Sequence, residues 1–254
     1  MSELPSVAGV GLLTPHWPVP LAVHAAFTLR AGGASDAPFD SLNVATHVGD
    51  SPPAVLENRR RLRERLRLPA EPAWLEQVHG SRVADLDADE GAGIGPAAAD
   101  AGFTRRTGTV CVVQVADCLP VLLAARDGGA VAAAHAGWRG LAAGVLEAAV
   151  TALGVAPGAL SAWLGPCIGF EHFEVGEEVR SAFLAQDEAA ASAFVANARG
   201  RWQCDLAALA RRRLAILGVT SVFGSGSCTY ADRRFFSYRR DGKCGRMAAL
   251  IWLT

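Results

Sequence analysis

The chain has 254 residues, 51% of them hydrophobic and 19% charged, with 24 Lys and Arg against 25 Asp and Glu. This length suits one large domain or two small ones, and the composition is ordinary for a soluble globular protein. The net charge of −1 gives no general electrostatic attraction to nucleic acid or anionic membranes, so neither is expected as a partner.

Signals for export or membrane insertion are not evident in the sequence. No apolar run reaches the roughly 18 residues that a membrane span needs. Residues 1–20 contain no basic region and are broken by prolines, which argues against a secretory signal. The six cysteines are scattered without a CxxC pair, so neither a disulfide framework nor a zinc ribbon is indicated. We therefore expect a reducing, cytoplasmic environment.

Strand and helix patterns alternate along the chain. In chain order, the sequence predicts a strand over 21–30, turns over 31–43, an amphipathic helix over 51–68, and a strand over 74–86 that is interrupted at His79-Gly80. A surface loop over 89–101 precedes strands at 109–118, 119–125 and 130–138, a helix at 140–154 and a strand at 160–169. Residues 171–218 are predicted to be mainly helical, and strands return at 235–240 and 246–254. The alternation of strands and helices, without a repeat or a long linker, predicts a single α+β domain over residues 1–254. We expect mixed β-sheets, hairpins and flanking helices, with the first 20 or so residues peripheral.

A hairpin in the middle of the chain places a thiol near an imidazole. Asp127-Gly128 is a turn signal between two apolar strands. A loop of even length, which makes Arg126 face Gly129, pairs His135 with Pro120. Because side chains alternate along a strand, Cys118 then shares a face with His135 as its diagonal neighbour. Such neighbours lie about 7–8 Å apart, within reach of one metal ion, whereas a loop of three residues would put them on opposite faces.

The other thiols and imidazoles carry weaker signals. Cys111 lies inside an apolar strand and is expected to be a core residue. His79 interrupts a strand beside a glycine, where a ligand could approach closely. The remaining histidines are expected to be structural or on the surface: His16, His24, His47 and His172.

Several motifs occur together in one order: EQVHGSRV, ADCLPVLL, HAGWRGLAAGV, LGPCIGFEHFEVG and CTYADRRFFSYRRDGKCGRMAALIWL. From about Phe27 to the C-terminus, the chain resembles the laccase-domain family, first labelled multicopper polyphenol oxidase and later understood as zinc-dependent purine nucleoside phosphorylases. The resemblance implies that His79, Cys118 and His135 are the zinc ligands and catalytic residues. Cys244 departs from the threonine that is usual before Gly-Arg in the family, without affecting the ligands.

The resemblance implies a small-molecule enzyme. Its reactions would be phosphorolysis of adenosine, inosine, guanosine and methylthioadenosine to base plus ribose 1-phosphate, with adenosine deamination in addition, although the HxE and PCxxC signature of base deaminases is absent. Three ligands leave a fourth zinc position for water or substrate. The protein is expected to be a monomer or homodimer.

Phosphorolysis also needs cationic groups for phosphate, a role that suits the arginine fork. The candidate substrate-binding residues are Arg30, Asn43 and Arg59, with further candidates at Arg139, Arg239, Arg240 and Arg246.

Three other classes remain open at this point. A copper polyphenol oxidase would use more histidines than the six present, and no HxH pair occurs. A metal-independent cysteine hydrolase acting on an amide or cell-wall peptide could use Cys118 as nucleophile and His135 as base. A binding module could use zinc only to join two strands and a loop, with Asp117 or another residue as a fourth ligand.

Overall fold

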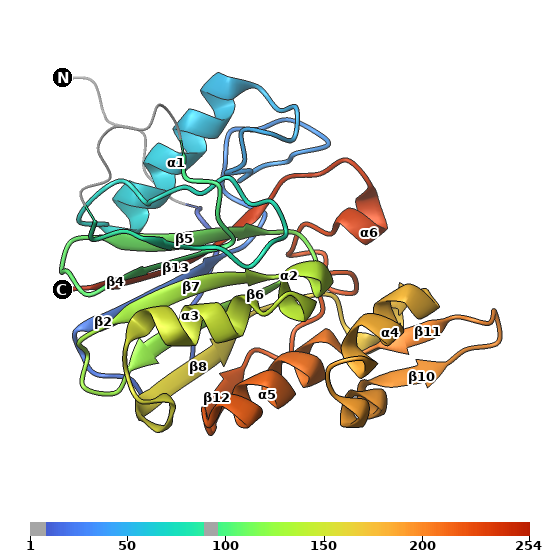
Figure 1. Ribbon diagram of the computed structural model, residues 1–254. Helices are drawn as coiled ribbons and strands as arrows, with labels where there is room; N and C mark the ends of the chain where they lie inside the picture. The colour runs from blue at the N-terminus through green and yellow to red at the C-terminus, as the bar shows by residue number, and fades with distance from the viewer. Residues whose placement is uncertain (1–8, 89–95) are drawn as a thin grey trace, which may run out of the picture.

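Two β-sheets lie face to face in the computed structural model, which describes residues 9–88 and 96–254, and helices cover their outer faces (Figure 1). The four-stranded sheet has the order β1-β2-β13-β5, with β1 (Leu12–Leu13), β2 (Val23–Thr28), β13 (Met247–Leu253) and β5 (Val110–Val115). All its neighbouring strands are antiparallel. One of its faces packs on the second sheet and the other on α1 (Pro52–Leu66).

The second sheet has six strands and carries the predicted hairpin. Its order is β12-β8-β6-β7-β4-β3, with β12 (Ser221–Gly224), β8 (Leu160–Leu164), β6 (Leu119–Ala125), β7 (Val131–Ala136), β4 (Ala101–Thr104) and β3 (Val83–Asp85). The pairs β12–β8 and β3–β4 are parallel and the others antiparallel. Its outer face packs against α3 (Val145–Leu153) and α5 (Leu206–Leu217).

Helices and a small third sheet complete the architecture. The remaining helices are α2 (Trp138–Ala142), α4 (Glu177–Leu184), α6 (Tyr238–Asp241) and the 3-10 turns η1 (Pro157–Ala159), η2 (Phe170–His172) and η3 (Glu188–Ala193). The third sheet has the order β10-β11-β9, with β10 (Phe194–Ala196), β11 (Trp202–Cys204) and β9 (Glu174–Val175), and it projects at one end of the molecule (Figure 1). The α+β class is confirmed. Among the described residues, no helix has the length and apolarity needed to cross a bilayer.

The hairpin register agrees with the prediction. Pro120 pairs with His135 and Ala124 with Val131, so an even number of residues lies between paired positions. Leu119, Val121 and Leu123 contribute to the core under the helices, whereas Leu122 and Ala124 face the other sheet. The even-numbered side chains of β6, and Cys118 just before it, therefore belong to the layer between the two sheets.

The segment between β5 and β6 carries the chain from one sheet to the other. The two predicted strands of this region form as separate strands, and Asp117, between them, has a positive φ of 91°. A positive φ is uncommon outside glycine, so the backbone turns sharply at this residue. Cys118 follows directly and therefore lies where the chain crosses between the sheets.

Several predicted elements differ in the structure. The predicted strand over 235–240 is wrong, because the Ser237 hydroxyl caps the short helix α6 by accepting a hydrogen bond from the Arg240 backbone N–H. The single helix over 140–154 divides into α2 and α3 at Gly144, whose φ is 90°. Of the predicted strand over 74–86, only β3 forms. The mainly helical prediction over 171–218 missed β9, β10 and β11.

The predicted loop over 89–101 is only partly described. Residues 89–95 lie outside the described residues, as do residues 1–8 of the N-terminal segment, and Ala101 begins β4.

Candidate metal centre

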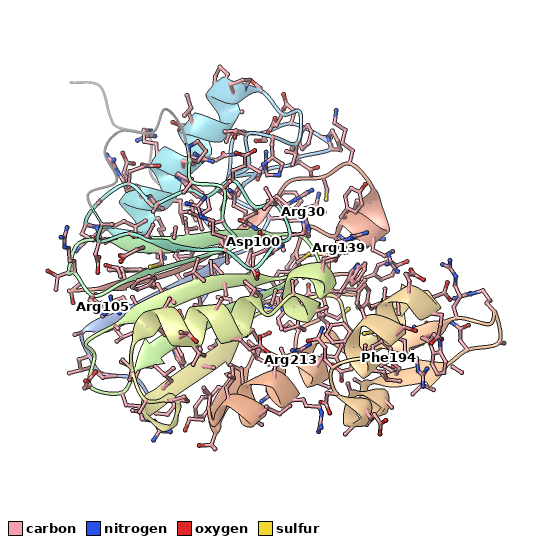
Figure 2. All side chains as sticks on the ribbon, in the orientation of Figure 1. Arg30, Asp100, Arg105, Arg139, Phe194 and Arg213 are labelled. Carbon is pink, nitrogen blue, oxygen red and sulfur yellow. The ribbon has the colours of Figure 1, made fainter. Side chains whose placement is uncertain are left out.

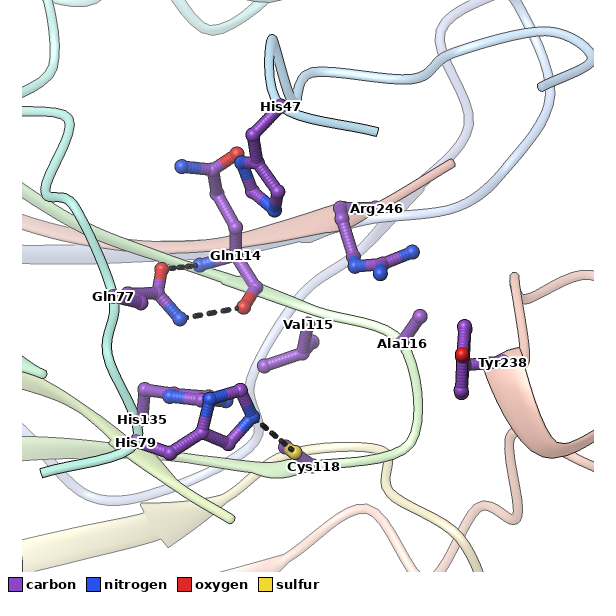
Figure 3. A pocket seen from close by; sticks show the side chains of 10 residues that line it. All are labelled: His47, Gln77, His79, Gln114, Val115, Ala116, Cys118, His135, Tyr238 and Arg246. Carbon is purple, nitrogen blue, oxygen red and sulfur yellow. Dashed lines mark hydrogen bonds between the residues drawn. The ribbon is translucent and has the colours of Figure 1, made fainter. Parts of the chain in front are cut away.

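Three side chains from distant parts of the chain meet at the end of the sheet sandwich. His79 precedes β3, Cys118 precedes β6, and His135 lies in β7. Their ligand atoms all lie within 4.8 Å of one another, and His79 Nε2 is 3.9 Å from Cys118 Sγ (Figure 3). Tetrahedral zinc with ordinary bond lengths would bring a sulfur and a nitrogen ligand to about 3.5 Å. The separation of His79 Nε2 and Cys118 Sγ therefore exceeds that of such a site by a few tenths of an ångström.

Asp100 holds two of these residues in place. Its buried carboxylate accepts a hydrogen bond from His135 Nδ1 at 2.8 Å and from the backbone N–H of Val78, His79 and Gly80 at 3.2, 2.9 and 2.6 Å. The first contact leaves His135 Nε2 free to bind a metal, and the other three fix the loop in which His79 has a φ of 61°.

The local electrostatics prepare Cys118 to act as a ligand. Burial alone would raise the pKa of its thiol, but the positive charge of His135 and hydrogen bonds from both histidines outweigh burial and lower the pKa to about 6. Burial would lower the pKa of His135, but the Cys118 thiolate and the Asp100 hydrogen bond raise it to about 9. The pair therefore forms a thiolate beside an imidazolium, and a metal ion would displace the imidazolium proton.

Two glycines allow the HAGWRG segment to pack closely against Cys118 and the His79 loop. A Cβ atom on Gly137 would lie 2.9 Å from Cys118 Sγ and 3.2 Å from His79 Cδ2. A Cβ atom on Gly140, in α2, would lie 2.8 Å from the Gly80 carbonyl oxygen. Small residues are therefore required where the HAGWRG segment packs on the ligands.

The three residues line one side of a cavity of about 320 Å³. The opposite side carries His47, Gln114, Tyr238 and Arg246, and Figure 3 shows these side chains arranged around the same space. Two further cavities share lining residues with it. One, of about 580 Å³, includes Arg59 and Trp74, and the other, of about 360 Å³, includes Lys243.

Positive charge gathers around His47. Burial, followed by the charges of Arg246 and Arg59, lowers the pKa of His47. Arg246 donates to the carbonyl oxygens of Cys244 and Gly245, and Arg59 donates to the Val44 carbonyl oxygen. Within residues 9–88 and 96–254, neither guanidinium group forms an ion pair with a carboxylate. The site therefore offers uncompensated charge to an anion.

The structure separates the three predicted substrate-binding residues. Arg59 lies in a cavity that adjoins the metal centre. Arg30, labelled in Figure 2, lines another cavity, of about 500 Å³, and pairs with Asp40 at 3.0 Å. Asn43 is fully buried, and its Oδ1 accepts a hydrogen bond from the Arg246 backbone N–H at 2.9 Å. Asn43 therefore contacts the residue that faces the cavity.

The other arginine candidates and Asp117 have contacts elsewhere. Arg139 is exposed on α2 and stacks on Trp138 (Figure 2). Arg239 and Arg240 donate to backbone carbonyl groups. The two carboxylate oxygens of Asp117 accept hydrogen bonds from the Thr229 hydroxyl and the Arg239 backbone N–H, so it does not join the ligand group.

Sequence reasoning missed several residues of this site. Asp100 fell in a segment predicted as a loose loop, although a metal-binding histidine commonly donates to a carboxylate, which was a reason to search for one. His47 was expected to be structural or on the surface, but it lines the cavity. Gln77 and Gln114 were not singled out. Gln77 pairs through its amide with the backbone N–H and carbonyl of Gln114, at 2.7 and 2.9 Å.

Known proteins match this chain over nearly its whole length. A purine nucleoside phosphorylase of Pseudomonas aeruginosa is 54% identical over 243 residues, covering 95% of this chain and 98% of the relative. Purine nucleoside phosphorylase YfiH of Escherichia coli is 51% identical with the same coverage. The crystal structure of a Neisseria meningitidis protein superimposes with a TM-score of 0.91 at 46% identity, covering 96% of this chain and 99% of that one. YlmD from Geobacillus stearothermophilus gives a TM-score of 0.87 at 32% identity, covering 96% of both chains.

The family model described as multi-copper polyphenol oxidoreductase laccase matches residues 24–254. The chain therefore belongs to this laccase-like family, together with relatives that are named purine nucleoside phosphorylase.

Proposed function

We propose that this protein is a zinc-dependent purine nucleoside phosphorylase, which converts adenosine, inosine, guanosine and methylthioadenosine to the free base and ribose 1-phosphate. The observation that carries the proposal is the sharing of one cavity by the His79–Cys118–His135 group, His47 and the cationic Arg246. The names of the relatives support the reaction.

The donor set supports zinc as the metal. One thiolate and two imidazoles are ordinary zinc ligands, and three protein ligands leave a position open to a reactant. When bound, zinc would supply a Lewis acid that polarises a coordinated oxygen or nitrogen atom. Asp100 would keep His135 in the ligating tautomer through its bond to Nδ1.

The residues opposite the ligands suit phosphate. Arg246 has its Nη1 held by carbonyl oxygens, so its guanidinium group is oriented before an anion arrives. Neutral His47 and the nearby Arg59 add a hydrogen-bonding group and a second positive charge. In the reaction, a phosphate oxygen bonds to C1′ of the ribose as the bond from C1′ to the base breaks, and the base takes the electron pair. Arg246 would hold the phosphate for this step.

A copper oxidase is less well supported. Cysteine with two histidines also occurs in blue-copper centres, but a multicopper enzyme needs additional copper ions. In the part of the chain that the structure describes, only one group of three His, Cys, Asp or Glu residues could hold a metal. Metal analysis of protein purified without added metals separates the two proposals.

The low pKa of Cys118 favours a second candidate, the metal-independent cysteine hydrolase. A thiolate beside histidines, one of which is oriented by Asp100, has the arrangement of an activated nucleophile. Activity that survives a chelator and disappears on alkylation of the thiol would favour this candidate.

The test is incubation of zinc-loaded protein with adenosine and phosphate, followed by identification of the products. Adenine with ribose 1-phosphate, formed only when phosphate is present, supports phosphorolysis. Inosine with ammonia supports the deaminase activity. Removal of zinc by a chelator should abolish turnover, and added zinc should restore it. If neither product forms with the metal-loaded protein, the proposed function is wrong.

A further inference from the structure

Gln114 occupies an unusual position beside the metal centre. It lies near the end of β5, and its backbone groups are held by the Gln77 side chain. Its own side chain extends into the space next to His47 (Figure 3) and is only 7% exposed. Gln114 lines both the cavity of the metal ligands and the cavity of Trp74, so it stands where the two meet.

The side-chain oxygen of Gln114 has no hydrogen-bond partner. Among the described residues, this is true of only three buried side-chain atoms, on Gln114, Glu147 and Arg180. The other two residues use their remaining polar atoms in ion pairs, with Arg213 and Glu177, and line none of the cavities described above. An unsatisfied buried polar atom costs about 1–3 kcal/mol. Gln114 Oε1 is therefore positioned to receive a donor from a ligand.

The adjoining cavity combines apolar walls with polar and charged groups. Trp74, Leu75 and Pro96 form its apolar part, Arg59 and Glu76 also line it, and Gln114 closes the side toward the metal ligands. The Arg59 guanidinium lies over the Trp74 ring, 3.9 Å from its centroid. Pockets for small molecules commonly combine apolar walls with a few such polar groups. A nucleoside with its base in this cavity would direct its ribose toward the space between the metal ligands and Arg246.

We propose that Gln114 binds the N1–C6 edge of the purine base and that its neutral amide accepts both 6-amino and 6-oxo purines. This inference rests on the proposed function. A glutamine amide offers a donor, NH₂, beside an acceptor, Oε1. A 6-aminopurine presents N1 as acceptor and the amino group as donor, whereas a 6-oxopurine presents N1–H as donor and O6 as acceptor. Rotation of the amide by half a turn matches either pattern with two hydrogen bonds.

A carboxylate at the same place would match neither pattern in full. Ionised glutamate only accepts hydrogen bonds. It can accept from the N1–H of a 6-oxopurine but then opposes O6, and it can accept from the amino group of a 6-aminopurine but then opposes N1. The positive charges of Arg59 and Arg246 nearby would favour the ionised form of an introduced Glu side chain. The substitution Gln114→Glu therefore leaves one hydrogen bond and one repulsion with either purine class and should weaken the binding of both.

The experiment measures kcat/KM for phosphorolysis of adenosine and inosine by zinc-loaded wild type, Gln114→Glu and Gln114→Leu at pH 8. A bidentate amide–base contact contributes about 1–3 kcal/mol of discrimination, which is roughly 5- to 150-fold. We expect Gln114→Glu and Gln114→Leu each to lower kcat/KM for both substrates by such a factor. Gln186→Glu makes the same change as Gln114→Glu at an exposed position outside the cavities and should leave both values unchanged.

Measuring the affinity for the free bases by calorimetry tests the role of Gln114 without requiring that the protein catalyse phosphorolysis. Gln114→Glu should lose affinity for adenine and for hypoxanthine alike, whether or not the protein catalyses phosphorolysis. If the wild type binds both bases but cleaves no nucleoside, the proposed function fails and the role of Gln114 stands. If the wild type binds neither base, or if Gln114→Glu, folded as judged by its thermal unfolding, keeps the wild-type affinity for either base within twofold, the inference is overturned.

Discussion

Replacing Asp100 by Asn should weaken metal binding and loosen the His79 loop, because one carboxylate serves both. Oδ1 accepts from His135 Nδ1 and the His79 backbone, and Oδ2 accepts from the Val78 and Gly80 backbones. An Asn amide has only one acceptor oxygen, so in either orientation two of these donors face an NH₂ group.

Each orientation of the amide has its own consequence. If the NH₂ group faces His135, the imidazole must accept at Nδ1 and carry its proton on Nε2, which cannot then bind a metal. If the NH₂ group faces the loop, two backbone donors lose their partner. Hydrogen bonds to charged groups contribute about 1.5–3 kcal/mol each. The exposed parts of the loop can recover some of this from water, so we expect a loss of about 2–4 kcal/mol in unfolding free energy.

Two measurements follow the effect. Zinc affinity, from competition with a chromophoric chelator, should fall 10- to 100-fold, the usual effect of removing a partner of a metal-binding histidine, which is about 1.4–2.7 kcal/mol. Urea unfolding of the metal-free protein should show the loss in stability. Asp36→Asn, at an exposed position, is the matched control. The reasoning is refuted if Asp100→Asn keeps the zinc affinity of the wild type within twofold and its unfolding free energy within about 0.5 kcal/mol, roughly the scatter of surface substitutions.

Three further predictions concern the same site. Gly137→Ala should lower zinc affinity at least about tenfold, because the added Cβ atom crowds Cys118 Sγ. Gly158→Ala is the control, since a Cβ atom there meets nothing within 4 Å and should leave zinc affinity unchanged. Equal zinc affinities of the two variants in the chelator competition would contradict this. In the metal-free protein, the rate of Cys118 alkylation by iodoacetamide should rise with pH through about 6 and then level off. The reason is that the lowered pKa of Cys118 makes its thiolate abundant near neutral pH. A rate that still rises toward pH 9 would argue against the thiolate–imidazolium pair. A charged hydrogen bond contributes about 1.5–3 kcal/mol, so Arg246→Ala should raise the KM for phosphate by roughly 10- to 150-fold. A phosphate KM equal to that of the wild type would remove Arg246 from the proposed phosphate site.

The sequence predicted those features that depend on short-range patterns. The alternation of side chains in β6 and β7, together with the turn at Asp127-Gly128, was enough to pair Pro120 with His135 and to bring Cys118 to the same face. Predictions from similar local patterns failed where polar side chains made contacts that the patterns do not encode. Ser237 caps a helix where a strand was predicted, and the Asp100 carboxylate accepts hydrogen bonds from the backbone of the His79 loop.

Residue types, strand register and the family motifs were therefore available from the sequence alone, because they depend on periodicity and on the order of residues along the chain. The assembly of His47, Gln114 and Arg246 opposite the metal ligands was decided only by the tertiary structure. These three residues come from separate segments at the end of the sheet sandwich, and no spacing rule relates them. Their meeting depends on how the two sheets stack and on the crossing of the chain between them at Asp117.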